Sequence, residues 1–141
     1  MITGKAQLTS NTCEWETPDK LYDELNDEFH FALDVCATPD NAKCALYFSR
    51  EQDGLKQKWG GTAWCNPPYG KGIRQWVHKA YHETYNGVTT VMLLPARTDT
   101  AWFHDYVLPY AEIRFHRGRV KFKGGSYPAP FPSIICIFRG E

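Results

Sequence analysis

The stretch Val88-Thr-Thr-Val-Met-Leu-Leu94 decides the fold class of this 141-residue chain. Its apolar residues follow one another instead of alternating, which is typical of a strand that is buried on both faces. Such a strand needs a covering layer on each side, and helices are expected to supply it. A helix is predicted near residues 99–108, and a second over residues 71–85. The apolar face of that second helix consists of Ile73, Trp76, Val77 and Ala80.

Further strand patterns lie on both sides of this central segment. They cover residues 31–35, 62–65, 111–116, 119–123 and 132–138. An N-terminal helix is predicted to begin with Thr17 as its N-cap and Pro18 in its first position. Residues 124–130 are expected to join the last two strands as a hairpin. The alternation predicts a compact, open, mostly parallel α/β sheet with a C-terminal antiparallel hairpin, whose ligands bind at the carboxyl ends of the strands.

Length and composition favour one domain, residues 1–141. The chain is 43% hydrophobic and 15% aromatic, which is enough for one packed core. No apolar signal region and no run of about 18 apolar residues is present, so a cytoplasmic location is expected. Residues 1–65 carry 6 Lys and Arg against 11 Asp and Glu, whereas residues 66–141 carry 10 against 5. This asymmetry is compatible with a polyanion that meets the C-terminal half, and equally with chance.

The five cysteines are dispersed and form no CxxC pair. This usage is typical of reduced thiols and not of a disulfide framework. No metal is expected, because no set of residues has the spacing of a zinc site. The one alternative ligand set consists of Cys13, Cys36, Cys44 and Cys65.

The motif Asn66-Pro67-Pro68-Tyr69 follows a predicted strand and indicates chemistry on an exocyclic amine. The lone pair of an adenine N6 amine is delocalised into the ring, so the amine is a poor nucleophile. Two acceptors that grip its two hydrogens would localise that lone pair. The Asn66 side-chain oxygen and the Pro67 carbonyl are the candidates, and Tyr69 offers a face for an extruded base. The alternative is an ordinary turn after a strand.

Several stretches in addition to this motif resemble the amino-group DNA methyltransferases, most closely the small phage and prophage DNA adenine-N6 methyltransferases of the Dam type. The similar stretches are Trp15–Pro18, Leu33–Pro39, Asn41–Cys44, Glu51–Leu55, Trp64–Gly70, Leu94–Asp99 and Phe131–Ser133. The resemblance implies a Rossmann-like methyltransferase sheet, S-adenosylmethionine as cofactor and double-stranded DNA as partner. It also implies a bacterial host cytoplasm and a role in protecting phage DNA from restriction.

The resemblance assigns roles to individual residues. Trp15, Thr17 and Pro18 match the element that closes over the methionine end of the cofactor. Asp34, Cys36 and Ala37 match the first cofactor loop, with Asp34 on the methionine ammonium, and Asp53 with Leu55 matches the element that reads the cofactor's adenine. The tetrad is catalytic, and Asn66 also borders the cofactor. The structural alternatives are a turn or cap for Asp34 and an Asp-Gly turn for Asp53.

The chain also departs from the family pattern. A glycine-rich first loop is absent, and no separate target-recognition domain is expected within residues 1–141. About thirty residues separate Asp34 from Asn66, which leaves little room for the usual two intervening strands, one of which commonly ends in a ribose-binding carboxylate. Asp40 and Glu51 are alternative substitutes for that carboxylate.

Basic residues at alternate positions suggest contacts with DNA phosphates. Alternate positions are occupied by Arg117, Arg119, Lys121 and Lys123, which on a strand would project from one face. The alternative is a solvated strand whose other face, Val120 and Phe122, packs inward. Arg97 follows the central strand and is predicted to contact DNA or to pair with a carboxylate such as Asp99.

Two other functions stay open. A protein glutamine methyltransferase uses the same tetrad on an amide nitrogen, and a non-catalytic nucleic-acid-binding module could retain the fold. The similar stretches outside the tetrad and the basic row favour DNA adenine methylation. The sequence predicts neither the DNA site nor the oligomeric state.

Overall fold

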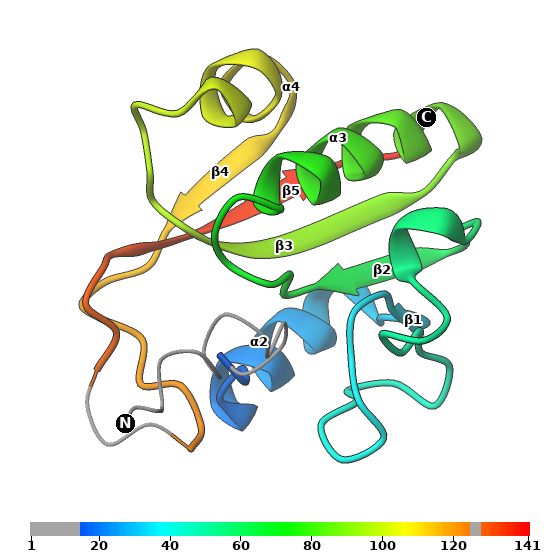
Figure 1. The fold of residues 1–141 in the computed structure, drawn as a ribbon, viewed down its shortest axis with the longest axis horizontal. Coiled ribbons are helices and arrows are strands. Elements are labelled where there is room, and N and C mark those ends of the chain that lie inside the picture. Colours follow the sequence, from blue (N-terminus) through cyan, green and yellow to red (C-terminus); the bar gives the residue numbers. More distant parts are fainter. Residues whose placement is uncertain (1–14, 125–127) are drawn as a thin grey trace.

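A five-stranded sheet in the order β1-β2-β3-β5-β4 forms the centre of the molecule (Figure 1). The computed structural model describes residues 15–124 and 128–141. The strands are β1 (Leu33–Asp34), β2 (Thr62–Cys65), β3 (Thr89–Pro95), β4 (Glu112–Phe115) and β5 (Ser133–Phe138). The helical elements are α2 (Asp19–Phe29), η1 (Gly54–Lys56), α3 (Ile73–Glu83), η2 (Thr84–Asn86), the π-helical turn η3 (Phe103–Val107) and α4 (Leu108–Tyr110).

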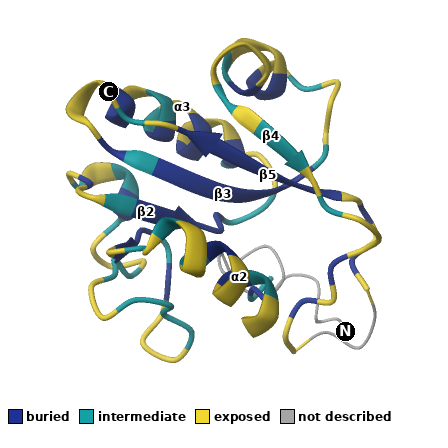
Figure 2. Ribbon diagram, turned by 180° about the vertical axis from the view of Figure 1, so that it is seen from behind, coloured by how far each residue is buried: buried dark blue, intermediate teal, exposed yellow. Residues whose placement is uncertain are grey.

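The central strand β3 is buried along nearly its whole length, as its sequence predicts. All of its residues except Thr89 are buried. It pairs in parallel with β2 and antiparallel with β5, so both of its edges are covered by backbone hydrogen bonds. Figure 2 shows β3 and β5 as the darkest part of the ribbon, whereas the outer side of α2 is exposed. The prediction of a fully buried central strand is therefore confirmed.

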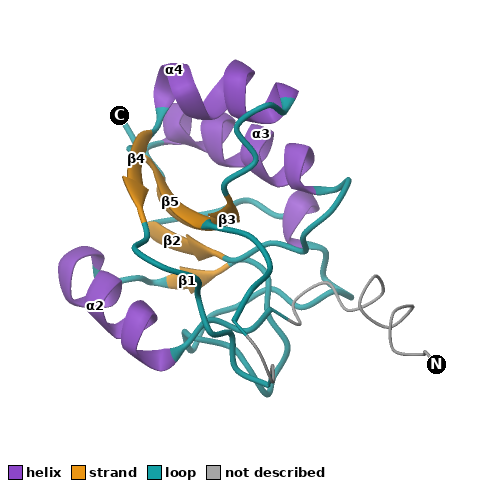
Figure 3. Ribbon diagram, turned by 90° about the vertical axis from the view of Figure 1, so that its left-hand side faces the viewer, coloured by secondary structure: helices purple, strands orange, loops and turns teal. Residues whose placement is uncertain are grey.

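Helices cover both faces of the sheet (Figure 3). Met92 and Leu94 of β3 face the core that α3 and η3 cover, together with Trp76 and Val77. Val91 and Leu93, which alternate with them, face the other core. That second core is closed by α2 and by a segment from the chain's last third: Val120, Phe122, Ala129 and Phe131. The alternation of side chains along β3 thus divides its apolar residues between two layers.

The sheet is mixed, and the prediction of a mostly parallel sheet is wrong. The pairs β1–β2 and β2–β3 are parallel, but β5 runs antiparallel to both β3 and β4. The reason lies in the connection between β4 and β5, residues 116–132. In its described residues, 116–124 and 128–132, it forms no helix, whereas a crossover between parallel neighbours usually contains one.

The C-terminal antiparallel pair exists, but its first partner differs from the predicted one. β4 pairs with β5, and residues 119–123 form no strand within the described chain apart from one bridge between Lys123 and Glu16. Residues 119–123 still alternate as expected: Val120 and Phe122 are buried, and their neighbours are exposed. The segment alternates because it packs on a face of the sheet and not because it joins the ladder.

The helices predicted from apolar periodicity and capping residues are found in the structure, but one N-cap assignment is wrong. The helix over residues 71–85 appears as α3 and η2, and its four predicted apolar residues are buried. The helix predicted near 99–108 appears at residues 101–110. α2 begins at Asp19 with Pro18 as N-cap and no side-chain cap, so the assignment of Thr17 as N-cap is wrong. The Thr17 hydroxyl instead accepts a hydrogen bond from Asn66. No helix in the described residues is long and apolar enough to cross a membrane.

The strand pairings gather four carboxyl ends at one edge of the sheet. β1, β2, β3 and β4 all run in the same direction, and β5 begins at that edge. The short segment between β1 and β2 adds no strand to the sheet and contributes only η1 and a bridge between Asp34 and Tyr47. The residues that follow β1 and β2 are therefore close neighbours, separated by one strand spacing of about 5 Å.

Gly54 allows the segment before β2 to pack against the end of β1. A Cβ at this position would lie 2.1 Å from the Val35 carbonyl oxygen, whereas a Cβ at the exposed Gly60 would meet nothing within 4 Å. We expect Gly54→Ala to lower the free energy of unfolding by about 1–3 kcal/mol, the range of overpacking. Gly60→Ala, the matched control, should change it by less than about 0.5 kcal/mol. Denaturant unfolding measures both, and equal stabilities of the two variants would contradict this packing.

Candidate active site

Asn66 immediately follows β2, where the two prolines after it prevent the helical conformation and end the strand. Its side chain is 7% exposed. The amide nitrogen Nδ2 donates to the Trp15 carbonyl and, at 3.1 Å, to Thr17 Oγ1. These two acceptors fix the orientation of the amide. The other end of the amide, Oδ1, is buried and has no hydrogen-bond partner among the described residues.

A buried oxygen without a partner is costly, so it indicates a site for a donor that a ligand would bring. Asn66 Oδ1 is a strong acceptor at the edge of the sheet where the strands end. The two hydrogen bonds of Nδ2 fix its orientation. The structure thus brings together the acceptor that the sequence predicts and two residues of the N-terminal element, Trp15 and Thr17.

Asp34 ends β1, one strand away from Asn66, and is 2% exposed. Its carboxylate accepts backbone N–H groups from Cys36 at 3.2 Å and from Lys43 at 3.0 Å. Burial raises the pKa of this carboxyl to about 6, and the two N–H donors and the Lys43 charge offset only part of that rise. Within the described part of the chain, no cation forms a salt bridge with Asp34. A buried carboxylate of this kind is suited to a cationic ligand.

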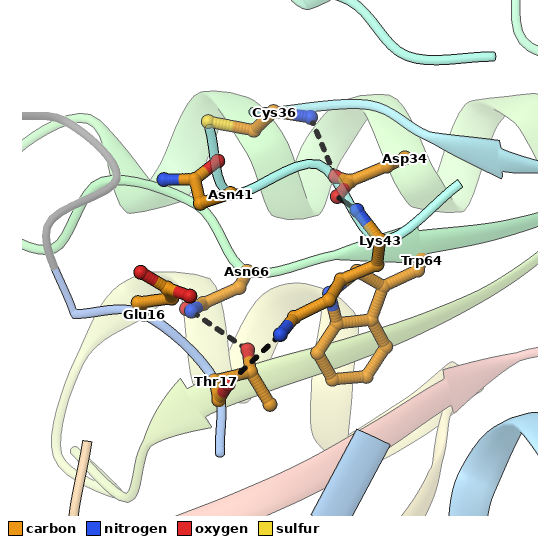
Figure 4. Close-up of a pocket in the computed structure, with 8 residues that line it drawn as sticks. All are labelled: Glu16, Thr17, Asp34, Cys36, Asn41, Lys43, Trp64 and Asn66. Carbon is orange, nitrogen blue, oxygen red and sulfur yellow. Dashed lines mark hydrogen bonds between the residues drawn. The ribbon is translucent and has the colours of Figure 1, made fainter. Parts of the chain in front are cut away.

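Asp34 and Asn66 line one pocket (Figure 4). The lining residues are Glu16, Thr17, Asp34, Cys36, Asn41, Lys43, Trp64 and Asn66. The predicted residues Thr17, Asp34 and Cys36 therefore meet in space. Pro18 does not line this pocket.

A second cavity, of about 320 Å³, shares Cys36 with this pocket. Its lining includes the predicted residues Cys36, Ala37, Asp53, Leu55 and Pro68. Asp53 has a φ of 57° and accepts the Leu55 N–H at 3.1 Å, so the Asp-Gly turn is real as well. The two predictions for Asp53, a cofactor-binding carboxylate and an Asp-Gly turn, are compatible. The carboxylate is half exposed, and it can still accept a hydrogen bond from a ligand in the cavity.

Tyr69 lies in an aromatic cluster and does not form an open platform. Its ring stacks on Trp15 at 6.3 Å between centroids, with an interplanar angle of 19°. Phe122 and Phe131 meet it edge-on at 6.2 Å and 5.5 Å. The hydroxyl donates to the Leu93 carbonyl at 3.0 Å, and burial raises the pKa of the phenol. The cluster fixes the tetrad from β2 against residues of the chain's last third.

Arg97 lies beside this cluster. Its guanidinium sits 5.8 Å from the centroid of the Phe131 ring, a cation–π arrangement. No ion pair joins Arg97 to Asp99 in the part of the chain that the structure describes. The cation remains exposed at the edge of the sheet where β3 ends.

The predicted basic row is exposed and borders a groove. Arg119 and Lys121 line a cavity of about 310 Å³ together with Lys20, His116 and Glu24. Arg117 is exposed but does not line it.

Lys123, at the end of the same row, behaves differently. It pairs with Glu16 at 3.3 Å and with Asp19 at 3.2 Å. Among residues 15–124 and 128–141, no such partner neutralises Lys20 or Lys121.

Sequence reasoning missed Lys20 and the pocket residues Lys43 and Trp64. Lys43 stands in a similar stretch, Asn41–Cys44, yet nothing in the local sequence indicates which side chains it meets. Neither Asp40 nor Glu51 lines the two pockets, and both are exposed.

The cysteines do not converge in the described chain. The thiols of Cys36, Cys44, Cys65 and Cys136 are not joined in disulfides, and no group of three or more His, Cys, Asp or Glu side chains that could hold a metal occurs among the described residues. Cys13, the fourth member of the alternative ligand set, lies outside the described residues.

Comparison with known proteins gives consistent matches. Residues 5–133 match the sequence model of the family described as DNA N-6-adenine-methyltransferase (Dam). A DNA N-6-adenine-methyltransferase of Escherichia phage T1 is 32% identical over 120 residues, covering 79% of this chain and 50% of the phage protein. A protein of the same name from Haemophilus phage HP1 is 30% identical over 116 residues, covering 80% of this chain and 67% of that protein. The matched region thus spans half of the T1 relative's length.

Burial of Asp34 predicts a specific dependence of stability on pH. Because its folded-state pKa of about 6 exceeds the ordinary value of 3.8, ionisation opposes folding. This penalty is absent below pH 3.8 and complete above pH 6. At about 1.4 kcal/mol per pKa unit, it amounts to about 3 kcal/mol. Between pH 4 and pH 7.5, the unfolding free energy of Asp34→Asn should therefore rise by that amount relative to the wild type. A difference that is constant with pH would contradict the raised pKa.

Proposed function

The chain belongs to the DNA N-6-adenine-methyltransferase (Dam) family, and from that membership we propose that it transfers a methyl group from S-adenosylmethionine to the N6 amine of adenine in double-stranded DNA. The observation that carries the proposal is the buried Oδ1 of Asn66, which lies in an Asn-Pro-Pro-Tyr motif and has no hydrogen-bond partner among the described residues. The matched region spans only half of the T1 relative, so the proposal concerns residues 1–141 as one methyltransferase domain. Its sheet is proposed to be a shortened methyltransferase sheet, in the cytoplasm of a bacterial host.

The residues that line the two pockets suit the two ends of the proposed cofactor chemically. A buried carboxylate, Asp34, suits the methionine ammonium, and the half-buried Asp53 beside Leu55 suits the adenine amino group. The shared wall at Cys36 would then lie beside the middle of the molecule. When bound, the cofactor supplies an electrophilic methyl group on a sulfonium. Glu16 and Thr17 line the same pocket as Asn66, and the Trp15 carbonyl accepts a hydrogen bond from Asn66. This agrees with the closing role that the resemblance gives to Trp15, Thr17 and Pro18.

Asn66 is proposed to act on the target amine. Its Oδ1 accepts one N6 hydrogen, and the Pro67 carbonyl accepts the other, so that the nitrogen lone pair is directed out of the base plane. Trp15 and Thr17 hold Nδ2, so the acceptor is preorganised. Tyr69 would stack on the base, and since Trp15 now stacks on its ring, the base has to take a different face or displace the indole.

DNA phosphates are proposed to lie along the groove between α2 and residues 116–121. Arg119, Lys121 and Lys20 line this groove, and Arg117 extends its positive charge. Arg97 lies beside the aromatic cluster, at the edge of the sheet where β3 ends, and is proposed to contact the DNA as well. Cations that no carboxylate neutralises release counterions from DNA when they bind its phosphates. The residues of this groove are therefore expected to contribute to DNA binding, whereas Lys123 is already paired with Glu16 and Asp19.

Two alternatives compete with DNA adenine methylation. A glutamine methyltransferase would use the same Asn66 oxygen, and a non-catalytic module would use only the basic groove. The basic groove favours a nucleic-acid substrate over a protein amide. The Asn66 oxygen has no hydrogen-bond partner among the described residues, and the Asp34 carboxylate is buried. Both groups lower the stability of the fold when no ligand is bound, so they favour an enzyme over a binding module.

The test is single-turnover methyl transfer from labelled cofactor to unmethylated duplex DNA, with the product nucleoside identified by mass. Asn66→Ala removes the preorganised acceptor, so the rate should fall roughly 10²–10³-fold. Asn66→Asp keeps an acceptor but places a second oxygen against the Trp15 carbonyl, so its rate should lie between those of the alanine variant and the wild type. Full activity of Asn66→Ala, or label on cytosine or on a release-factor protein offered in parallel, would overturn the proposal.

The groove predicts how DNA affinity depends on salt. Arg119→Ala and Lys121→Ala should each weaken binding to any duplex and reduce the log–log salt slope by about one unit. Lys58→Ala removes an equal charge before β2, at the opposite edge of the sheet, and should leave the slope unchanged. Fluorescence anisotropy over a salt series measures all three. Equal slopes for the three variants would assign Arg119 and Lys121 to a solvated face.

A further inference from the structure

Lys43 places a largely buried positive charge in the pocket of Asp34 and Asn66. Its side chain is 11% exposed. The ammonium lies 5.7 Å from the centroid of the Tyr22 ring and donates to the Thr17 carbonyl at 3.0 Å. Burying a lysine charge is costly unless the charge is paired. The Lys43 ammonium therefore requires a partner.

Among the described residues, the carboxylate that forms a salt bridge with Lys43 is that of Asp19, and it is a weak partner. Asp19 lies 3.4 Å from the Lys43 ammonium, at the outer limit of a hydrogen bond, and its side chain is 70% exposed. Asp19 also binds Lys123, at 3.2 Å. An exposed carboxylate shared between two lysines contributes little to either. An ammonium has three donors, and only two of those on Lys43 have acceptors among the described residues.

The pocket therefore contains one buried anion and one buried cation that do not pair with each other. The backbone N–H of Lys43 binds Asp34, but its side chain runs away toward Thr17, and the described chain shows no salt bridge between the two charges. Figure 4 shows the Asp34 carboxylate and the Lys43 ammonium on different sides of the same pocket, with Asn66 at its edge. A ligand with both charges on adjacent groups would satisfy both residues at once.

We propose that Lys43 binds the α-carboxylate of the cofactor's methionine while Asp34 binds its ammonium. An α-amino acid is a zwitterion whose two charges are held on a single carbon, which matches a pocket with two separate opposite charges. The third N–H of Lys43 supplies the charge-assisted hydrogen bond. This assignment rests on the proposed use of S-adenosylmethionine.

The competing explanation is that Lys43 only ties residues 17–19 to the loop after β1. A tether would weaken every ligand of the pocket by the same factor. A carboxylate partner weakens only ligands that carry the carboxylate. The comparison of two ligands within one variant therefore separates the roles, whatever the variant does to stability.

The experiment measures the dissociation constants of S-adenosylmethionine and of decarboxylated S-adenosylmethionine, which keeps the ammonium, by isothermal titration calorimetry. The wild type should prefer the carboxylate form by roughly ten- to hundredfold, the range of a hydrogen bond to a charged group. Lys43→Met should lose this preference. Lys43→Gln keeps a polar side chain in the buried position and should lose most of the preference for the carboxylate form. This variant replaces Lys43→Met in the comparison if Lys43→Met unfolds.

Two variants act as controls. Lys123→Met removes the other lysine that binds Asp19 and should keep the wild-type preference. Asp34→Asn should weaken both ligands by a similar factor, because both carry the ammonium. The Lys43 assignment alone would be overturned if Lys43→Met and Lys43→Gln kept the wild-type preference. It would also be overturned if these variants lost affinity for both ligands by the same factor. Failure of the wild type to bind either ligand would overturn the proposed function and the assignment with it.

Discussion

The burial of β3 on both faces and along both edges is the constraint on which the rest of the structure depends. A strand whose residues are apolar on both sides needs a layer on each, so α3 and η3 cover one face and α2 covers the other. It also needs a neighbour on each edge, and β2 and β5 provide them. The carboxyl end of β2 is thereby held beside that of β3, and the functional motif follows directly from it. The position of Asn66 is a consequence of packing a strand that has no polar side.

The site combines three elements that local structure alone would not bring together. The N-terminal segment supplies Trp15 and Thr17, the strand ends supply Asp34 and Asn66, and the chain's last third supplies Phe122 and Phe131. Each of these polar groups is in an unfavourable environment: Asn66 Oδ1 has no donor among residues 15–124 and 128–141, the Asp34 carboxyl has a raised pKa, and Lys43 has a weak partner. Such conditions are expected where a protein is shaped for a ligand.

Periodicity and turn residues predicted most elements, because these depend on neighbours in the sequence. β2 was predicted with its observed bounds, and the apolar face of α3 residue by residue. The errors all concern contacts between distant residues. The Thr17 hydroxyl was expected to cap a helix, but it bonds to a side chain 49 positions away. The row at 119–123 alternates like a strand, yet it packs on the sheet instead of joining it. Lys43 meets Thr17, 26 positions away, so no local pattern could have indicated its surroundings.

The order of the strands has a consequence for synthesis of the chain on the ribosome. Of the five strands in this sheet, β5 is the last in chain order, yet it lies between β3 and β4. Until residues 133–138 emerge, the inner edge of β3 presents unpaired backbone groups beside a fully apolar surface, and β4 has no partner at all. A nascent or prematurely terminated chain is thus a template for strand pairing with other chains. Quality control by chaperones and proteases would act on this open edge, and the whole sheet closes in a single late step.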